Sequence, residues 1–508
     1  MKRIIRVDHI WGDESAFDSV LIEDGVISRV ADFDDVSSPG VETLRFRDSI
    51  LLPGFTDAHL HLLWLGELLC GCDLRGCRNS REFRDRIQEH ARTLSQGDFL
   101  FGYGYNENEW EDARKPDHNM IDDVTDGLTT IITRVDGHTW LLNSKAIVFA
   151  NLSSVSDSEL LSHIDNHAGK LTGIVYDKAY SQLVAKIVPK ITDQKRREYL
   201  EKAQEYLLSL GITSCRSFGS LEDFLELAKM NQQNALKIRV CACLPTSALD
   251  WAIGVSVKTN SGTDKFWTGQ IKMFADGSLG SKTALVSKPY SNGSLGLEVT
   301  TIDEMTRITE KAHTCGLGVA IHAIGDIAVL NVAKVLSQLG TDIDFIEHFQ
   351  CNSKTAMNML KNKEINVILN PSHIPLDSAV IPVEWGQLQD MAYPQADFWQ
   401  TKMNVGFGSD APVATADPFH ALACAVTRRG KNTDTINPKQ AISFRKAFDV
   451  ATENSAQIIG GPKRGKIAPG YKADMVVVED KIRGLNPWEI PPIQPITVFV
   501  DGQIKWER

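Results

Sequence analysis

The stretch Ile50-Leu51-Leu52-Pro53-Gly54-Phe55-Thr56-Asp57-Ala58-His59-Leu60-His61 is an apolar run that ends in two histidines. In an extended strand, side chains at positions i and i+2 lie on the same face. His59 and His61 can therefore direct two imidazole rings toward one point, as two ligands of one metal ion must. The alternative is a strand whose two histidines are satisfied by local hydrogen bonds.

Seven further short apolar runs come after this stretch, and most of them are followed by a helical pattern. They are residues 211–215, 237–242, 270–274, 318–322, 344–348, 366–370 and 405–410. Strands that alternate with helices are typical of parallel sheets, and eight such units predict an α/β fold with a closed (β/α)8 TIM-like barrel. An open doubly wound sheet is the alternative, but no glycine-rich dinucleotide turn follows the first strand.

The two ends of the chain share a hairpin pattern. Residues 19–28 and 496–505 each contain an Asp-Gly pair between apolar runs, and residues 474–478 predict another strand. Neither end has enough strands for a sheet stack of its own. We therefore expect residues 1–50 and 462–508 to form one small β-sandwich domain from both termini, and residues 51–461 to contain the barrel.

The distance between the first and second predicted barrel strands is too long for a single helix. We expect residues at about 65–205 to form an inserted α/β subdomain. An insertion after a barrel strand lies at the carboxyl-end face, where barrels carry their active sites. The aromatic side chains of this insertion favour an apolar substrate pocket, and Trp110 and His138 are its candidate substrate contacts.

Composition narrows the class of protein. The 508 residues carry a net charge of −11 without long charged runs, which argues against a nucleic-acid or anionic-membrane partner. No apolar stretch resembles a signal peptide or reaches the ~18 residues that a membrane-spanning helix needs, so we expect a cytoplasmic protein.

The nine cysteines of the chain are widely spaced and odd in number, which is typical of reduced thiols. Cys70, Cys72 and Cys77 favour small buried thiols over a structural zinc site, because a fourth ligand is missing.

The ends of the predicted barrel strands carry a set of ionisable side chains, and barrels place reactive groups at these positions. Each one alone has a structural explanation, such as a core histidine, an ion pair between Lys272 and Asp276, or a helix cap at Asp410. Their joint occurrence at equivalent positions instead predicts a metal centre. The set is His59 and His61 on the first strand, Lys272 on the fourth, His322 on the fifth, His348 on the sixth and Asp410 on the eighth.

This set of motifs resembles that of the metal-dependent amidohydrolase superfamily, and the surrounding sequence resembles the YtcJ-like branch of that superfamily, amidohydrolase family 3. The resemblance runs from about residue 20 to the C-terminus and is specific for chemistry rather than for substrate. The matching stretches are residues 53–61, 137–146, 272–280, 322–326, 346–348, 408–412 and 470–476.

The resemblance implies a set of metal ligands. In the family, histidines at the positions of His59 and His61 bind one metal together with the aspartate at the position of Asp410. Histidines at the positions of His322 and His348 bind a second metal. In many members the lysine at the position of Lys272 carries a CO2-derived carbamate that bridges both metals. Imidazole and oxygen ligands favour Zn2+, with Mn2+ or Fe2+ as alternatives. A site with a single metal is the other possibility.

The resemblance also implies the reaction. We expect hydrolysis of a non-peptide carbon–nitrogen bond in a small amide by metal-activated water, with Asp410 as general acid and base. Because this branch includes a deformylase of N-substituted formamides, N-acyl or N-formyl amines are the expected substrates. Asp276 and His373 are further candidates for shaping the pocket. The alternatives are a lactone or phosphoester hydrolase and a metal-free binding or scaffold protein. A homodimer is compatible with the sequence.

Overall fold

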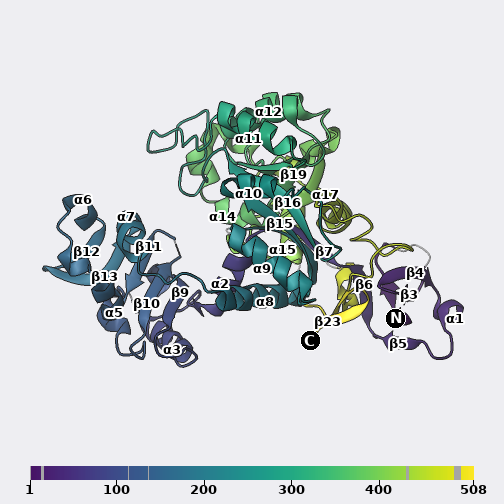
Figure 1. Cartoon of the computed structure of the whole chain (residues 1–508), viewed down its shortest axis with the longest axis horizontal. Coiled ribbons are helices and arrows are strands. Elements are labelled where there is room, and N and C mark those ends of the chain that lie inside the picture. Colours follow the sequence, from purple (N-terminus) through teal and green to yellow (C-terminus); the bar gives the residue numbers. More distant parts are fainter. Residues whose placement is uncertain (1, 13–15, 113, 136, 431–433, 485–492) are drawn as a thin grey trace. The chain divides into compact units, whose positions relative to one another are not determined.

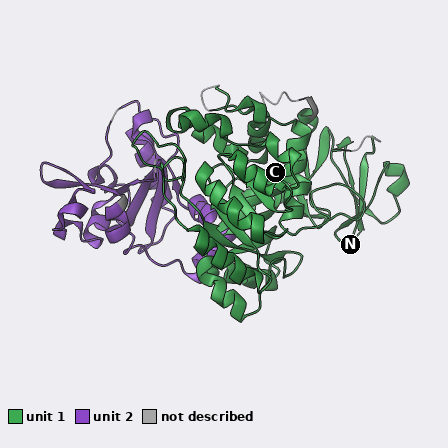
Figure 2. Ribbon diagram, turned by 90° about the horizontal axis from the view of Figure 1, so that it is seen from above, with its two compact units in different colours: residues 1–63, 203–508 green, residues 64–202 purple. Residues whose placement is uncertain are grey.

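The computed structural model describes residues 2–12, 16–112, 114–135, 137–430, 434–484 and 493–508. The chain divides into two compact units, of which one comprises Met1–Leu63 with Ala203–Arg508 and the other Trp64–Lys202 (Figure 2). Among the described residues, no helix combines the length and the apolar character needed to cross a membrane. The first unit contains the predicted metal ligands, and the second lies between the first and second barrel strands in sequence.

The first unit is built around eight parallel strands that pair in chain order (Figure 1). This arrangement confirms the (β/α)8 barrel. Closure occurs between the last and first strands, where the Asp410 amide donates to the His59 carbonyl at 2.7 Å and the Ser409 amide to Asp57 Oδ1 at 3.0 Å. The strands are β7 (Phe55–Leu60), β14 (Ile212–Phe218), β15 (Arg239–Pro245), β16 (Phe266–Phe274), β17 (Val319–Ala323), β18 (Phe345–His348), β19 (Asn366–Leu369) and β20 (Asn404–Phe407).

Helices follow most of the strands. In α11 (Ile302–His313), the Thr301 side chain caps the Glu304 amide, and buried Met305, Ile308 and Ala312 recur at helical spacing, which packs one face on the barrel. The other helices of this unit include α9 (Leu221–Gln232), α10 (Leu249–Gly254), α12 (Asp326–Leu339), α13 (Lys354–Leu360), α14 (Ile374–Asp377), α15 (Pro418–Thr427), α16 (Phe444–Asp449) and α17 (Ser455–Ile458), while α8 (Asp193–Ser209) crosses the boundary between the units.

Two small sheets form the β-sandwich of the same unit: one comes from the N-terminal segment alone, and the other combines strands from both chain ends. One has the order β4 (Val26–Ala31), β3 (Ser19–Glu23), β1 (Lys2–Arg6), β5 (Glu42–Arg45); α1 (Phe33–Val36) follows β4. The other has the order β2 (His9–Ile10), β6 (Ser49–Pro53), β21 (Met475–Glu479), β22 (Thr497–Val500), β23 (Gln503–Glu507). Ile5 and Val20 from the first sheet and Leu51, Val477 and Phe499 from the second are fully buried in one shared core. The exact domain boundaries stay a prediction.

Both predicted hairpin turns have the backbone that an Asp-Gly pair favours. Asp24 and Gly25 have φ angles of +50° and +79°, and Asp501 and Gly502 have φ angles of +53° and +68°. Two successive positive φ angles are those of a type I′ turn, whose twist matches the flanking strands.

The second unit contains a six-stranded sheet with its own hydrophobic core. The sheet order is β12 (Ile164–His167), β13 (Lys170–Tyr176), β11 (Thr139–Leu142), β10 (Thr129–Arg134), β9 (Phe99–Tyr105), β8 (Cys72–Asp73). Its helices include α3 (Ser80–Ala91), α4 (His118–Ile121), α5 (Ser144–Phe149), α6 (Ser158–Leu161) and α7 (Asp177–Ala179), while α2 (Leu62–Cys70) crosses the boundary between units. Cys72 and Cys77 are free, buried thiols, and burial raises the pKa of Cys72 to about 12.

A buried arginine joins the barrel to the sandwich. Arg239, the first residue of β15, is fully buried, and its guanidinium contacts Asp474 at 2.6 Å, Asp264 at 2.7 Å and Asp501. Asp474 and Asp501 flank strands β21 and β22 of the sandwich. Although burial opposes ionisation, Arg239 lowers the pKa of both Asp264 and Asp501. The position of β15 relative to the C-terminal strands therefore depends on a charge network.

We expect Arg239→Met to lower the free energy of unfolding by about 2 kcal/mol, because it leaves buried Asp474 without its cation. The loss stays below the ~3–5 kcal/mol of a fully buried pair, since the side chains of Asp264 and Asp501 are 46% and 26% exposed. Because the folded protein lowers the pKa of Asp264 and Asp501, the two carboxylates contribute their full stabilisation above pH ~4. This contribution is lost progressively as the pH falls through their pKa values in the folded state. Urea titrations at several pH values should therefore show a weaker acid dependence in the variant. Arg81→Met, at a 91%-exposed side chain, is the control; equal stability of both variants would refute the role of the network.

Candidate metal centre

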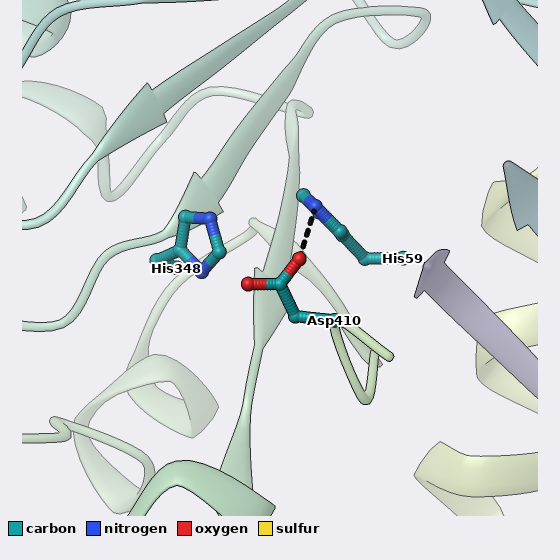
Figure 3. A group of neighbouring side chains, drawn as sticks. All are labelled: His59, His348 and Asp410. Atoms are coloured by element: carbon teal, nitrogen blue, oxygen red, sulfur yellow. Dashed lines mark ion pairs between the residues drawn. The ribbon is translucent and has the colours of Figure 1, made fainter. Parts of the chain in front are cut away.

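Three buried side chains from separate strand ends converge at the carboxyl end of the barrel (Figure 3). They are His59 from β7, His348 from β18 and Asp410, which follows β20. One potential ligand atom from each lies within 4.8 Å of the others, and His59 Nε2 is 3.3 Å from Asp410 Oδ1. Two imidazoles and a carboxylate at this spacing form a donor set suited to a divalent transition metal.

The hydrogen bonds of the two imidazoles fix which nitrogen faces this centre. His59 Nδ1 lies 2.5 Å from Glu347 Oε2, and His348 Nδ1 lies 2.8 Å from Asn370 Oδ1. Since both partners are acceptors, each Nδ1 donates a hydrogen bond, and each Nε2 is the nitrogen left to face a metal ion. Burial lowers the pKa of His348 well below its usual range, which favours the neutral ring. Metal-binding histidines have this arrangement, so the residues present fit a metal ion.

The other three predicted ligands line the same cavity, which has a volume of about 370 Å³. His61 Nε2 lies 3.2 Å from Asp410 Oδ1. His322 Nε2 lies 2.9 Å from the Gly277 carbonyl, and its ring centroid is 4.5 Å from that of His348. Lys272 is buried, and burial lowers the pKa of its amine. The structure thus brings all six predicted residues together, while their individual roles as ligands stay a prediction.

The backbone is strained at two of the converging residues. His348 has φ +71° and Asp410 has φ +59°, in the left-handed region that residues with a β-carbon rarely adopt. The Asp410 amide is held in place by its hydrogen bond to the His59 carbonyl. Strained backbone that the surroundings fix in this way is concentrated at functional sites.

Comparison with known proteins agrees with this geometry. The model of the amidohydrolase family matches residues 47–505. The chain belongs to the amidohydrolase family. It is 28% identical over 516 residues to the putative amidohydrolase YtcJ of Bacillus subtilis, covering 97% of this chain and 96% of the relative. It is 21% identical to an N-substituted formamide deformylase of Arthrobacter pascens, covering 97% and 96% of the two chains.

A solved structure shows the same fold. An uncharacterized metal-dependent hydrolase from Pyrococcus furiosus is 25% identical and superimposes with a TM-score of 0.80, covering 96% of this chain and all of the other. The family resemblance inferred from the motifs is therefore confirmed. This amidohydrolase is a metal-dependent hydrolase that acts on carbon–nitrogen bonds other than peptide bonds.

The two further candidates for the pocket, His373 and Asp276, lie in different surroundings. His373 lines the cavity, and its Nε2 lies 3.8 Å from Asp410 Oδ2 without a hydrogen-bond partner among the described residues. Asp276 instead accepts amide hydrogens from Leu285, Ile324 and Gly325 at 2.8–3.0 Å. It therefore fixes the loops after β16 and β17, and no ion pair with Lys272 is found in the described part of the chain.

The two candidate contacts in the insertion lie in different environments. Trp110 is 5% exposed within the insertion's hydrophobic core, with its ring centroid 5.1 Å from that of Phe83. This burial argues against a substrate contact, because the indole ring is already covered by apolar side chains. His138 is exposed between β10 and β11. A contact between His138 and substrate stays a prediction.

The sequence analysis missed a buried ion pair that supports the centre. Glu347, adjacent to His348, accepts from Arg216 Nη1 at 2.8 Å as well as from His59, and both charged side chains are fully buried. Although burial opposes ionisation, Arg216 and His59 lower the pKa of Glu347 to about 2. The available signal was a charged residue in or next to two predicted barrel strands, Arg216 and Glu347, because burying such charges is costly unless they are paired.

Proposed function

We propose that this amidohydrolase cleaves the amide bond of a small N-acyl or N-formyl amine, with Asp410 as general acid and base. The observation that carries the proposal is the convergence of His59, His61 and His348 on one carboxylate at the wall of a closed-barrel cavity. The similarity to an N-substituted formamide deformylase supports the choice of bond.

The ligand assignment follows from the donor atoms. His59, His61 and Asp410 would hold one divalent ion, with Zn2+ the first choice, and His322 and His348 would hold a second. When bound, such an ion supplies Lewis acidity, which lowers the pKa of water toward ~7 and polarises a carbonyl. Burial favours the neutral amine of Lys272, the form that reacts with CO2, and the two oxygens of the carbamate would serve both ions.

Asp410 is placed for two successive proton transfers. Its Oδ1 contacts both His59 and His61, and its Oδ2 faces His373. One carboxylate can take the proton of the attacking water and deliver it to the leaving nitrogen, which must depart as a neutral amine. The hydrogen bond from the Asp410 amide to the His59 carbonyl, at 2.7 Å, fixes the backbone that carries this carboxylate.

The cavity disfavours the phosphoester alternative. Its described lining contains Asp377 and Asp410 and, apart from histidines, one basic residue, Lys272, whose amine has a pKa lowered by burial. A phosphoester site requires an anion pocket of basic side chains or amide groups. A neutral or cationic amide fits this lining better.

The test is a panel of N-formyl and N-acyl amines, with lactones and phosphoesters of similar size as the comparison. We expect release of primary amine from at least one amide when Zn2+ or Mn2+ is present. A chelator should remove more than about 90% of the activity, and metal should restore it, because the cation activates the water. Turnover of only lactones or phosphoesters, or full activity in metal-free protein, would refute the proposal.

Lys272→Ala tests the carbamate. We expect a fall in kcat of about 10²-fold or more, since the bridge between the cations is lost, and partial recovery on adding formate or acetate, whose two oxygens replace it. Metal content is measured in parallel by atomic spectroscopy. Lys265→Ala, at a lysine paired with Asp501 away from the cavity, serves as the control. Absence of rescue at unchanged metal content would contradict the bridge.

A further inference from the structure

The cavity wall contains a carboxylate that the proposed reaction does not use. Asp377 is the last residue of α14, and with Gln350 it lines the same cavity as the six converging residues. Its Oδ2 accepts from Tyr393 Oη at 2.6 Å and from the Gln350 side-chain amide. Two donors therefore fix the carboxylate in one orientation.

The other oxygen of this carboxylate has no partner. Within the described part of the chain, no residue donates a hydrogen bond to Asp377 Oδ1, and no lysine or arginine forms an ion pair with Asp377. Burial raises the pKa of this carboxyl, although the hydrogen bond from Tyr393 and the nearby His373 oppose the shift. A cation brought into the cavity would supply a countercharge and the missing donor.

The helical segment after β19 relates the position of Asp377 to that of Asp410, through His373. His373 and Asp377 lie four residues apart on consecutive helical turns, so their side chains share a face. His373 Nε2 is 3.8 Å from Asp410 Oδ2. Because one helical turn rises ~5–6 Å, we estimate that Asp377 lies on the order of 6–10 Å from the Asp410 carboxylate, where the proposed reaction would take place.

Several side chains of the same cavity lining are apolar. Leu279, Ile324, Leu376 and Val413 line the cavity together with Phe274. An alkyl chain of about four to six methylenes would contact these side chains while spanning the estimated distance. The cavity thus offers a reacting centre, an apolar wall and a distal anion.

We propose that Asp377, held by Tyr393 and Gln350, binds an ammonium or other cationic group at the far end of an amide substrate's alkyl arm. The substrate class is thus an N-acyl or N-formyl amine with a positive charge several methylenes from the amide. This inference rests on the proposed amide hydrolysis for its kinetic test but not for its binding test.

The kinetic test compares matched pairs of amides on the metal-loaded enzyme. The monoformyl derivative of 1,4-diaminobutane is paired with N-formylpentylamine, in which a methyl replaces the ammonium group. A second pair carries the ammonium or methyl group on the acyl arm. We expect kcat/KM to favour the ammonium member of one pair by about 10- to 100-fold, since a site built for a charged donor rejects the analogue that lacks it.

Asp377→Asn should remove this preference, so that the ammonium and methyl members of each pair have kcat/KM values within about twofold of each other. Asp390→Asn removes the same charge from an exposed position and should keep the preference. A wild-type enzyme without preference in either pair, or a preference that survives in Asp377→Asn, overturns the proposal.

A binding measurement separates this inference from the proposed function. Titration calorimetry compares pentylamine with 1-pentanol, its uncharged analogue, on the metal-loaded protein, and the amine should bind at least about 10-fold more tightly in wild type but not in Asp377→Asn. If no amide is hydrolysed but this difference is found, the proposed function fails and the cation subsite stands. If amides are hydrolysed but the two ligands bind equally, the subsite fails alone.

Discussion

Asp410→Asn is expected to lower kcat for any amide substrate by at least about 10³-fold while the barrel stays folded. An asparagine side chain cannot take the proton of the attacking water, and it lacks the charge that His59 and His61 face at 3.3 and 3.2 Å. The replacement preserves shape and one acceptor oxygen, and the Asp410 amide keeps its hydrogen bond to the His59 carbonyl. Single-turnover kinetics should therefore show the loss in the chemical step.

Two controls make this result specific. Asp303→Asn, at an exposed carboxylate in the first turn of α11, should leave both activity and melting temperature unchanged. Metal content of the Asp410→Asn protein distinguishes a lost proton transfer from a lost ion. A variant that binds metal and retains more than about a tenth of wild-type kcat would remove Asp410 from the general acid–base role.

Arg216→Met is expected to destabilise the fold by about 3–5 kcal/mol, because it leaves the fully buried carboxylate of Glu347 without its cation. Arg216 Nε also donates to Gln270 Oε1 at 2.8 Å, so the variant leaves that buried acceptor only the weaker donor Cys243 Sγ at 3.6 Å. Denaturant unfolding of the purified variant measures the loss. Wild-type stability in Arg216→Met would show that the barrel interior accommodates Glu347 uncharged.

The conservative variant Glu347→Gln separates stability from metal binding. Glutamine still reaches both partners but no longer offers His59 an anionic acceptor, so we expect a 10- to 100-fold weaker metal affinity with a smaller loss of stability. Competition with a metal indicator measures that affinity. An unchanged affinity would limit Glu347 to a packing role.

The sequence by itself predicted which side chains meet at the carboxyl end of the barrel, because strand and helix spacings are local. The i, i+2 spacing of His59 and His61 sets their common face, and the alternation of strands and helices predicts parallel pairing. Since parallel strands in a closed barrel present their carboxyl ends together, the positions of Lys272, His322 and His348 could be inferred without coordinates. The Asp-Gly pairs likewise fixed two hairpin turns.

Only the tertiary structure decided which distant groups pair. Arg216 and Glu347 are 131 residues apart and Ser409 and Asp57 are 352 residues apart, and no local spacing relates either pair. The fixed carboxylate of Asp377 likewise depends on Tyr393 and Gln350, which belong to other segments. Periodicity tells which face of an element a side chain occupies, but a buried charge finds its partner only when the barrel closes and excludes water.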